Sequence, residues 1–138
     1  MAKSNPINIR LELPVLNEIK NLAKALHLPL SMVLNRLIAE ALRMFQCPGI
    51  IFTNSPSGRR RATVAGSGLD VWEMISICKS YNKNYKKVLK DYPLTEIQLN
   101  AALNYYEHYK NEIDQEVKQN DEAEEFASSS KLVTKFSI

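Results

Sequence analysis

Apolar and polar residues alternate strictly near the start of the chain. Residues 7–13 read Ile-Asn-Ile-Arg-Leu-Glu-Leu, so every second side chain is apolar. A period of two places the apolar side chains on one face of a strand, which predicts a half-buried β-strand. Pro14 follows directly, and proline suits the first turn of a helix, where its missing N–H costs nothing. We therefore expect a strand that leads straight into a helix.

Two helical stretches follow this strand. In the first, apolar residues recur every three or four positions from Leu16 to Leu26. The segment His27-Leu28-Pro29-Leu30 interrupts the pattern, and Ser31 is a good N-cap for a second helix. An apolar stripe at helical spacing then runs through Leu34, Leu37, Ile38, Ala41, Leu42 and Phe45. Cys47-Pro48-Gly49 ends this second helix.

One strand and two helices make too small a unit to be stable alone. A chain of roughly 45 residues buries too little surface, and a lone strand has no ladder partner. Two copies that pair their strands and interlock their helices would remove both defects. The pattern over residues 5–46 resembles the ribbon-helix-helix family of MetJ, Arc and CopG repressors. This resemblance predicts an intertwined dimer with a core of Ile9, Leu11, Leu13, Leu34, Leu37 and Ile38.

The same resemblance implies a DNA-binding surface. In that family the paired strands enter the major groove, where outward side chains read the bases; here these side chains are Asn8, Arg10 and Glu12. Asn, Arg and Glu suit adenine, guanine and cytosine edges respectively. The family also holds a phosphate at the start of its second helix, here near Ser31 and Met32. A solvated strand face is the alternative, since alternation is common to both.

The sequence pattern over residues 49–120 predicts a hairpin followed by helices. The β-prone runs 49–52 and 62–65 flank a turn-rich loop. Asp70 with Glu73 begins a helix over 71–80, and a short basic helix follows over 85–91. Thr95 with Gln98 forms a capping box for a long helix that carries Leu99, Ala102, Leu103, Tyr106, Ile113 and Val117 on one face.

This region resembles a second family. Residues 64–72 read Val-Ala-Gly-Ser-Gly-Leu-Asp-Val-Trp, residues 88–95 read Val-Leu-Lys-Asp-Tyr-Pro-Leu-Thr, and residues 99–105 read Leu-Asn-Ala-Ala-Leu-Asn-Tyr. These blocks resemble the antitoxin-associated family catalogued as domain of unknown function 433, of the VapB type. That family has Gly-Thr-Arg where this chain has Gly66-Ser67-Gly68, so its arginine is absent. The resemblance implies a helix-turn-helix-like domain with a β-hairpin, and a PIN-like ribonuclease toxin as partner.

Charge divides the chain into a basic and an acidic part. The net charge is only +3, but residues 1–95 hold 14 basic and 6 acidic side chains, a balance of +8. Residues 96–138 hold 4 basic and 9 acidic side chains, a balance of −5. Within the basic part, Arg59, Arg60 and Arg61 are candidates for DNA phosphate contacts. A charged hairpin edge that resists aggregation is the alternative for this run.

The last residues combine acidic, serine and apolar positions. Residues 121–138 begin with an acidic patch and a serine run, a composition typical of a flexible linker. The apolar residues of this tail, Phe126, Leu132, Val133, Phe136 and Ile138, are candidates for toxin binding, by ordering on the partner or by strand addition. A terminus that docks on its own domain is an equally weighted alternative.

Composition narrows the class of protein. No apolar run approaches the roughly 20 residues that span a bilayer, and Met1–Asn5 lacks the layout of a signal peptide. Cys47 and Cys78 form no CxxC, so a reducing cytoplasm is the simplest location. The histidines, His27 and His108, have no ligand spacing, and no phosphate-binding loop is present, so we expect neither catalysis nor a cofactor or metal.

Together these features predict a mainly α, cytoplasmic homodimer with three parts. Residues 1–47 form a ribbon-helix-helix module, residues 48–120 form an antitoxin-like hairpin and helical domain, and residues 121–138 form a tail. The predicted function is that of an antitoxin that represses its own operon and neutralises a PIN-like ribonuclease. A transcriptional repressor without a toxin and a dimeric scaffold that does not bind DNA remain the alternatives.

Overall fold

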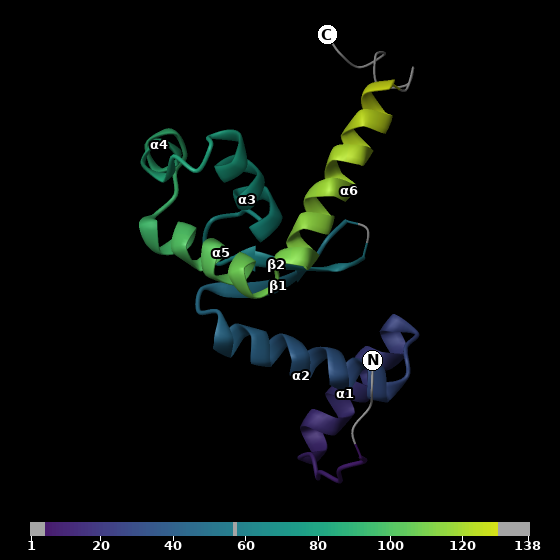
Figure 1. Cartoon of the computed structure of the whole chain (residues 1–138). Coiled ribbons are helices and arrows are strands. Elements are labelled where there is room, and N and C mark those ends of the chain that lie inside the picture. Colours follow the sequence, from purple (N-terminus) through teal and green to yellow (C-terminus); the bar gives the residue numbers. More distant parts are fainter. Residues whose placement is uncertain (1–4, 57, 130–138) are drawn as a thin grey trace. The chain divides into compact units, whose positions relative to one another are not determined.

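The computed structural model describes residues 5–56 and 58–129, which are mainly helical with one two-stranded hairpin (Figure 1). The elements in chain order are α1 (Leu13–Leu26), α2 (Leu30–Gln46), β1 (Ile50–Asn54), β2 (Arg60–Val64), α3 (Val71–Ser80), α4 (Tyr85–Asp91), α5 (Glu96–His108) and α6 (Lys110–Ser129). The predicted mainly α fold with a β-hairpin is confirmed. The chain divides between Arg43 and Met44 into two compact units.

The start of the first unit differs from the predicted strand. Within the single described chain, residues 5–12 pair with no other strand, and Leu13 begins α1 instead of ending a strand. A strand is defined by ladder hydrogen bonds, and in a ribbon-helix-helix protein these come from a second copy. Pro14 lies in the first turn of α1, as predicted, because its fixed φ suits a helix start.

His27 ends α1 in a left-handed conformation, with φ 54° and ψ 41°. Its N–H donates to the Lys24 carbonyl (3.2 Å), and the Leu28 N–H donates to the Ala23 carbonyl (3.0 Å). This pair of bonds is a Schellman cap, which satisfies the last carbonyls of the helix and favours glycine at the left-handed position. His27 therefore occupies a backbone conformation that glycine prefers.

Replacing His27 by glycine is expected to stabilise the protein by about 1 kcal/mol, because glycine avoids the Cβ clash of the left-handed region. Urea unfolding of wild type and variant at one protein concentration measures the difference. His108→Gly is the matched control: His108 is the last residue of α5, so glycine there should give no gain. Equal or lower stability of His27→Gly would contradict the expectation.

The second helix begins two residues earlier than predicted. Leu30 is its first residue, so Ser31 lies inside the first turn and is not the N-cap. The Pro29 carbonyl accepts the first bonds of the helix, from the N–H groups of Met32 (3.1 Å) and Val33 (3.3 Å). Proline is compatible with this place because the cap needs no donor of its own.

The second unit has a continuous core between the hairpin and three helices. In the antiparallel hairpin Ile50 pairs with Val64 and Phe52 with Ala62. The most deeply buried core residues are contributed by the hairpin, α3, α5 and α6 and by the residue after α2: Cys47, Ile50, Ala62, Val64, Val71, Met74, Ile75, Ala102, Tyr105 and Ile113. Cys47, the residue after α2, belongs to this core. The two units divide earlier, between Arg43 and Met44 within α2, and not after residue 47.

The predicted helix starts of this unit are confirmed. Asp70 and Glu73 form a capping box on α3, and Thr95 and Gln98 form one on α5. In such a box each side chain bonds a backbone N–H that the helix itself leaves without an acceptor, so the pattern fixes the first residue of a helix. The bounds of α3 and α4 coincide with the predicted ranges 71–80 and 85–91.

The predicted single long helix after Thr95 is wrong, because it is broken at Tyr109 (Figure 1). Tyr109 leaves the helical conformation, with φ −131° and ψ 44°, and its hydroxyl donates to Gln46 Oε1. The break allows both Tyr105 of α5 and Ile113 of α6 to be fully buried, and α6 to pack along α3. Tertiary packing therefore overrides a sequence that contains no glycine or proline at this point.

The last helix is longer than expected. Residues 121–129, predicted to belong to a flexible linker, continue α6 as far as Ser129. Acidic residues have fair helix propensity, and the helix is already nucleated by its packing on the core. Phe126 lies on this part of α6 with 77% of its surface exposed. The candidates Leu132, Val133, Phe136 and Ile138 lie outside the described residues.

Within residues 5–56 and 58–129, no single helix has the length and hydropathy of a membrane span; α1 and α2 reach them only as a pair, with a bend of 108° between them.

Candidate functional site

The first unit leaves most of its apolar side chains exposed. The chain bends by 108° between α1 and α2, and the two helices share few contacts. In residues 5–43 the buried apolar side chains are Ala23 and Val33. By contrast, four predicted dimer-core residues are exposed, Ile9 by 59%, Leu13 by 67%, Leu37 by 38% and Ile38 by 50%. Leu11 and Leu34 are half-buried. A surface of this kind is costly in water and marks an interaction site.

The predicted base-reading side chains lie on the segment before α1. Asn8, Arg10 and Glu12 are all exposed and alternate with Ile9 and Leu11. The predicted phosphate site lies at the start of α2, where Ser31 and Met32 are exposed. The Met32 N–H already donates to Pro29, whereas the N–H groups of the first two helical residues have no acceptor within the helix. An anion at this end would therefore be held mainly by Leu30 and Ser31.

The three arginines of the hairpin have three different environments. Arg59 is exposed and donates to Gln119 Oε1 of α6 (3.0 Å). Arg60 turns back on the hairpin and donates to Asn54 Oδ1 (3.1 Å) and to the Phe52 carbonyl (3.2 Å). Arg61 is mostly buried beside Glu116 of α6, with 3.2 Å between Nη1 and Oε2. The run is thus no uniform basic surface, since Arg61 is committed to a partner inside the protein.

The Arg61–Glu116 pair is an internal charge contact between β2 and α6. The exposed fractions of the two side chains are 16% and 14%. The atoms meet without the alignment of a good hydrogen bond, so the attraction is mainly Coulombic. Burial raises the pKa of the Glu116 carboxyl, and the Arg61 charge opposes this shift. The pair therefore joins the hairpin to the last helix. Each buried charge is stabilised by the other, so removing one leaves its partner buried without a counter-charge.

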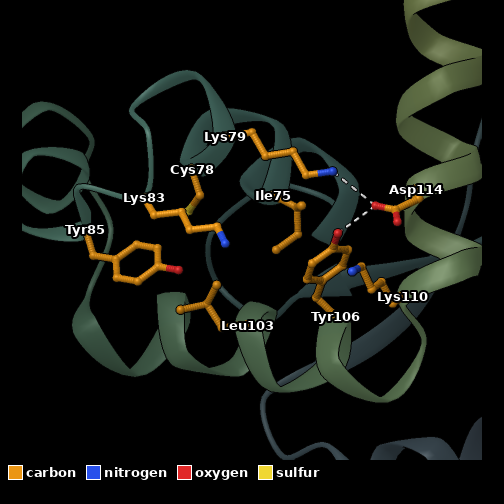
Figure 2. Close-up of a pocket in the computed structure, with 9 residues that line it drawn as sticks. All are labelled: Ile75, Cys78, Lys79, Lys83, Tyr85, Leu103, Tyr106, Lys110 and Asp114. Carbon is orange, nitrogen blue, oxygen red and sulfur yellow. Dashed lines mark hydrogen bonds and ion pairs between the residues drawn. The ribbon is translucent and has the colours of Figure 1, made fainter.

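A pocket of about 530 Å³ opens among α3, the turn after it, the start of α4, α5 and α6 (Figure 2). Lys79 Nζ lies 3.1 Å from Asp114 Oδ1, and the Tyr106 hydroxyl donates to the same oxygen at 2.7 Å. The Lys79 ammonium also lies 5.5 Å from the centre of the Tyr106 ring. These contacts hold one wall of the pocket in a defined arrangement. The lining residues are Ile75, Cys78, Lys79, Lys83, Tyr85, Leu103, Tyr106, Lys110 and Asp114.

The ionisable groups of this wall change each other's pKa values. The hydrogen bond from Tyr106, with a further contribution from Lys79, lowers the pKa of Asp114. The hydrogen bond to Asp114 raises the pKa of Lys79. Burial raises the pKa of the Cys78 thiol, which keeps this cysteine protonated and unreactive. The wall therefore carries a stable carboxylate–ammonium pair at neutral pH.

Sequence reasoning did not identify this pocket or the partner of Arg61. Lys79, Lys83 and Lys110 are spread over three elements, and no spacing rule connects them. The one usable signal was the pair Lys110 and Asp114, which are four residues apart and so lie on one helix face. In the described residues, no group of three or more His, Cys, Asp and Glu side chains is arranged to hold a metal ion.

The chain matches no protein-family model, no curated protein and no solved structure.

Proposed function

We propose that this protein is a dimeric DNA-binding regulator of the antitoxin type, whose first unit pairs with a second copy as a ribbon-helix-helix module. The observation that carries the proposal is the exposure of Ile9, Leu13, Leu37 and Ile38. The ribbon-helix-helix resemblance assigns these residues to a dimer core, and the single chain leaves all four exposed. Pairing of two copies would bury them and would supply the ladder partner that residues 7–12 lack.

The proposed DNA surface comprises the polar side chains of that ribbon and the start of α2. Asn8, Arg10 and Glu12 are exposed and would face away from the dimer core, because they alternate with it. Ser31 at the helix start would hold a phosphate. Arg59 is the hairpin arginine best placed to add a backbone contact, because it is exposed. Arg61 is left out of the proposed surface, since its charge is used by Glu116.

The antitoxin part of the proposal rests on the second unit and on α6. The hairpin and the capped helices α3 and α5 carry the blocks that resemble domain of unknown function 433. The last turns of α6 expose Asp121, Glu122, Glu124, Glu125 and Phe126. An acidic surface with one large apolar side chain suits the basic nucleic-acid groove of a PIN-like ribonuclease in the cytoplasm. In this proposal the first unit binds DNA and the end of α6 binds the toxin.

Replacing Arg10 by alanine is expected to weaken binding to the DNA upstream of the gene by about 1–3 kcal/mol per ribbon contact and to relax base preference at one position of each half-site. Gel-shift titrations on that DNA and on single-base variants measure both effects. Lys20→Ala is the matched control, because Lys20 is an exposed cation of α1 outside the ribbon. Its loss should leave base preference unchanged.

The same titrations separate the alternatives. Binding that is unaffected by Arg10→Ala, or that is absent at low salt, would contradict the DNA-binding proposal and favour a dimeric scaffold. Affinity that falls steeply with salt is expected if phosphate contacts contribute. Specific DNA binding without inhibition of any ribonuclease encoded beside the gene would favour the alternative of a transcriptional repressor that has no toxin.

A further inference from the structure

The pocket beside α3 gathers more positive charge than the protein itself neutralises. Three ammonium groups line it, from Lys79 on α3, Lys83 in the following turn and Lys110 on α6, against one carboxylate, Asp114. Within the described parts of the chain, Lys79 forms an ion pair with Asp114, the charge of Lys110 helps to lower the pKa of the same carboxyl, and Lys83 forms no ion pair. Three ammonium groups beside one carboxylate leave an excess of positive charge, a feature expected of an anion site.

The backbone holds Lys83 in an unfavourable conformation at the rim. Asn82 and Lys83 both have left-handed φ angles, 51° and 62°. Neither residue is glycine, and a Cβ atom disfavours this region, for lysine more than for asparagine. The Lys83 N–H donates to the Cys78 carbonyl (2.9 Å), which fixes the turn against the end of α3. Lys83 in this turn is therefore part of the pocket wall, and it is the lining lysine that forms no ion pair among the described residues.

The floor of the pocket is apolar. Figure 2 shows Ile75 and Leu103 on opposite sides of the space, with the Lys83 ammonium and the Tyr85 hydroxyl pointing into it between them. Cys78 is buried, and its protonated thiol behaves as a small apolar group. A free ion such as phosphate would use the ammonium groups and leave this floor in contact with water. A ligand with an apolar body would cover it.

We propose that this pocket binds a small organic anion: one phosphate or carboxylate group carried on a flat apolar body. The anionic group would be held by Lys83 with the hydroxyl of Tyr85, which lie near each other in Figure 2, while the body would lie against Ile75, Leu103 and the Tyr106 ring. The volume of about 530 Å³ lies in the range of pockets for small ligands. The Lys79–Asp114–Tyr106 contacts hold the wall in place, and Asp114 turns its charge toward Lys79.

Phenyl phosphate is the probe that tests this proposal, in a titration of the full chain followed by amide chemical shifts. We expect saturable shifts confined to the lining residues and an affinity at least about ten-fold tighter than that of inorganic phosphate, because only the aryl compound covers the apolar floor. Benzoate titrated in parallel distinguishes a carboxylate from a phosphate preference. No DNA is present, so the result is independent of the proposed DNA-binding function.

Two variants of the site and a matched control complete the test. Lys83→Gln and Tyr85→Phe are each expected to weaken phenyl phosphate binding about ten-fold or more, because each removes a charge-assisted hydrogen bond. Two variants are used so that misfolding of one, visible in its own spectrum, leaves the other. Lys118→Gln changes an exposed lysine of α6 outside the pocket and should bind like wild type. Absence of saturable shifts, equal affinity for inorganic phosphate, or an equal loss in Lys118→Gln would overturn the proposal.

Discussion

Replacing Ile38 by aspartate is expected to convert the proposed dimer into monomers and to abolish the proposed specific DNA binding. Ile38 lies on the apolar stripe of α2 and is half exposed in the single chain. Burying an isoleucine contributes about 1.5–3 kcal/mol, and the substitution acts on both copies of a symmetric interface. It also places two carboxylates in an apolar contact. The dimer dissociation constant should therefore rise by roughly a thousand-fold or more.

Light scattering at micromolar concentration, together with gel shifts on upstream DNA, measures this result. Ile97→Asp is the matched control, because Ile97 lies on α5 of the second unit and is 80% exposed. It introduces the same charge at an exposed isoleucine outside the proposed interface, and should leave mass and DNA affinity unchanged. An Ile38→Asp protein that remains dimeric and binds DNA would show that the apolar stripe of α2 is not the dimer core.

Removal of the Arg61 guanidinium is expected to cost about 3 kcal/mol of unfolding free energy, even though arginines on hairpins are usually dispensable. Arg61→Met keeps the length and apolar stem of the side chain but leaves Glu116 buried without its counter-charge. Breaking one side of a buried pair is costly for this reason, whereas replacing both partners is often nearly neutral. The double variant Arg61→Met with Glu116→Met should therefore recover much of the loss.

Urea unfolding at several pH values distinguishes this charge effect from lost packing. The pKa of Glu116 is raised by burial above its ordinary value and is restrained by Arg61. A carboxyl with a raised pKa in the folded state is most stabilising when protonated, so its contribution falls as pH rises through that pKa. Without Arg61 the pKa should rise further, and the deficit of Arg61→Met should shrink toward pH 4.

Arg59→Met is the control for this prediction. Arg59 is exposed and bonded to Gln119 through one hydrogen bond, so its loss should change stability by less than about 0.5 kcal/mol. A deficit in Arg61→Met that is the same at pH 4 and pH 7 would assign the loss to packing. A deficit no larger than that of Arg59→Met would contradict a structural role for Arg61.

Local signals in the sequence predicted many element boundaries correctly. The capping boxes at Asp70 and Thr95 placed the starts of α3 and α5, and Pro14 placed the first turn of α1. The hairpin followed from two β-prone runs around a turn-rich loop. In each case the determining interaction joins residues only a few positions apart, so one stretch of chain contains all of it.

Other features depended on residues that are distant in sequence. The break at Tyr109 follows from burying Tyr105 and Ile113 in one core, and Gln46, the bond partner of Tyr109, lies far away in the chain. Arg61 has the same sequence context as its neighbours, but Glu116 makes it an internal residue. Lys79, Lys83 and Lys110 share one pocket only because α6 packs along α3.

The sequence by itself thus determined the local elements, the apolar stripes and the basic-to-acidic division of the chain. Periodicity and capping are properties of neighbouring residues, and they are visible before folding. Only the tertiary structure decided which charges are used inside the protein and which remain available to a ligand. The physical reason is that the free energy of a charge depends on its burial and on the distance to its partners, and both are set by packing between elements.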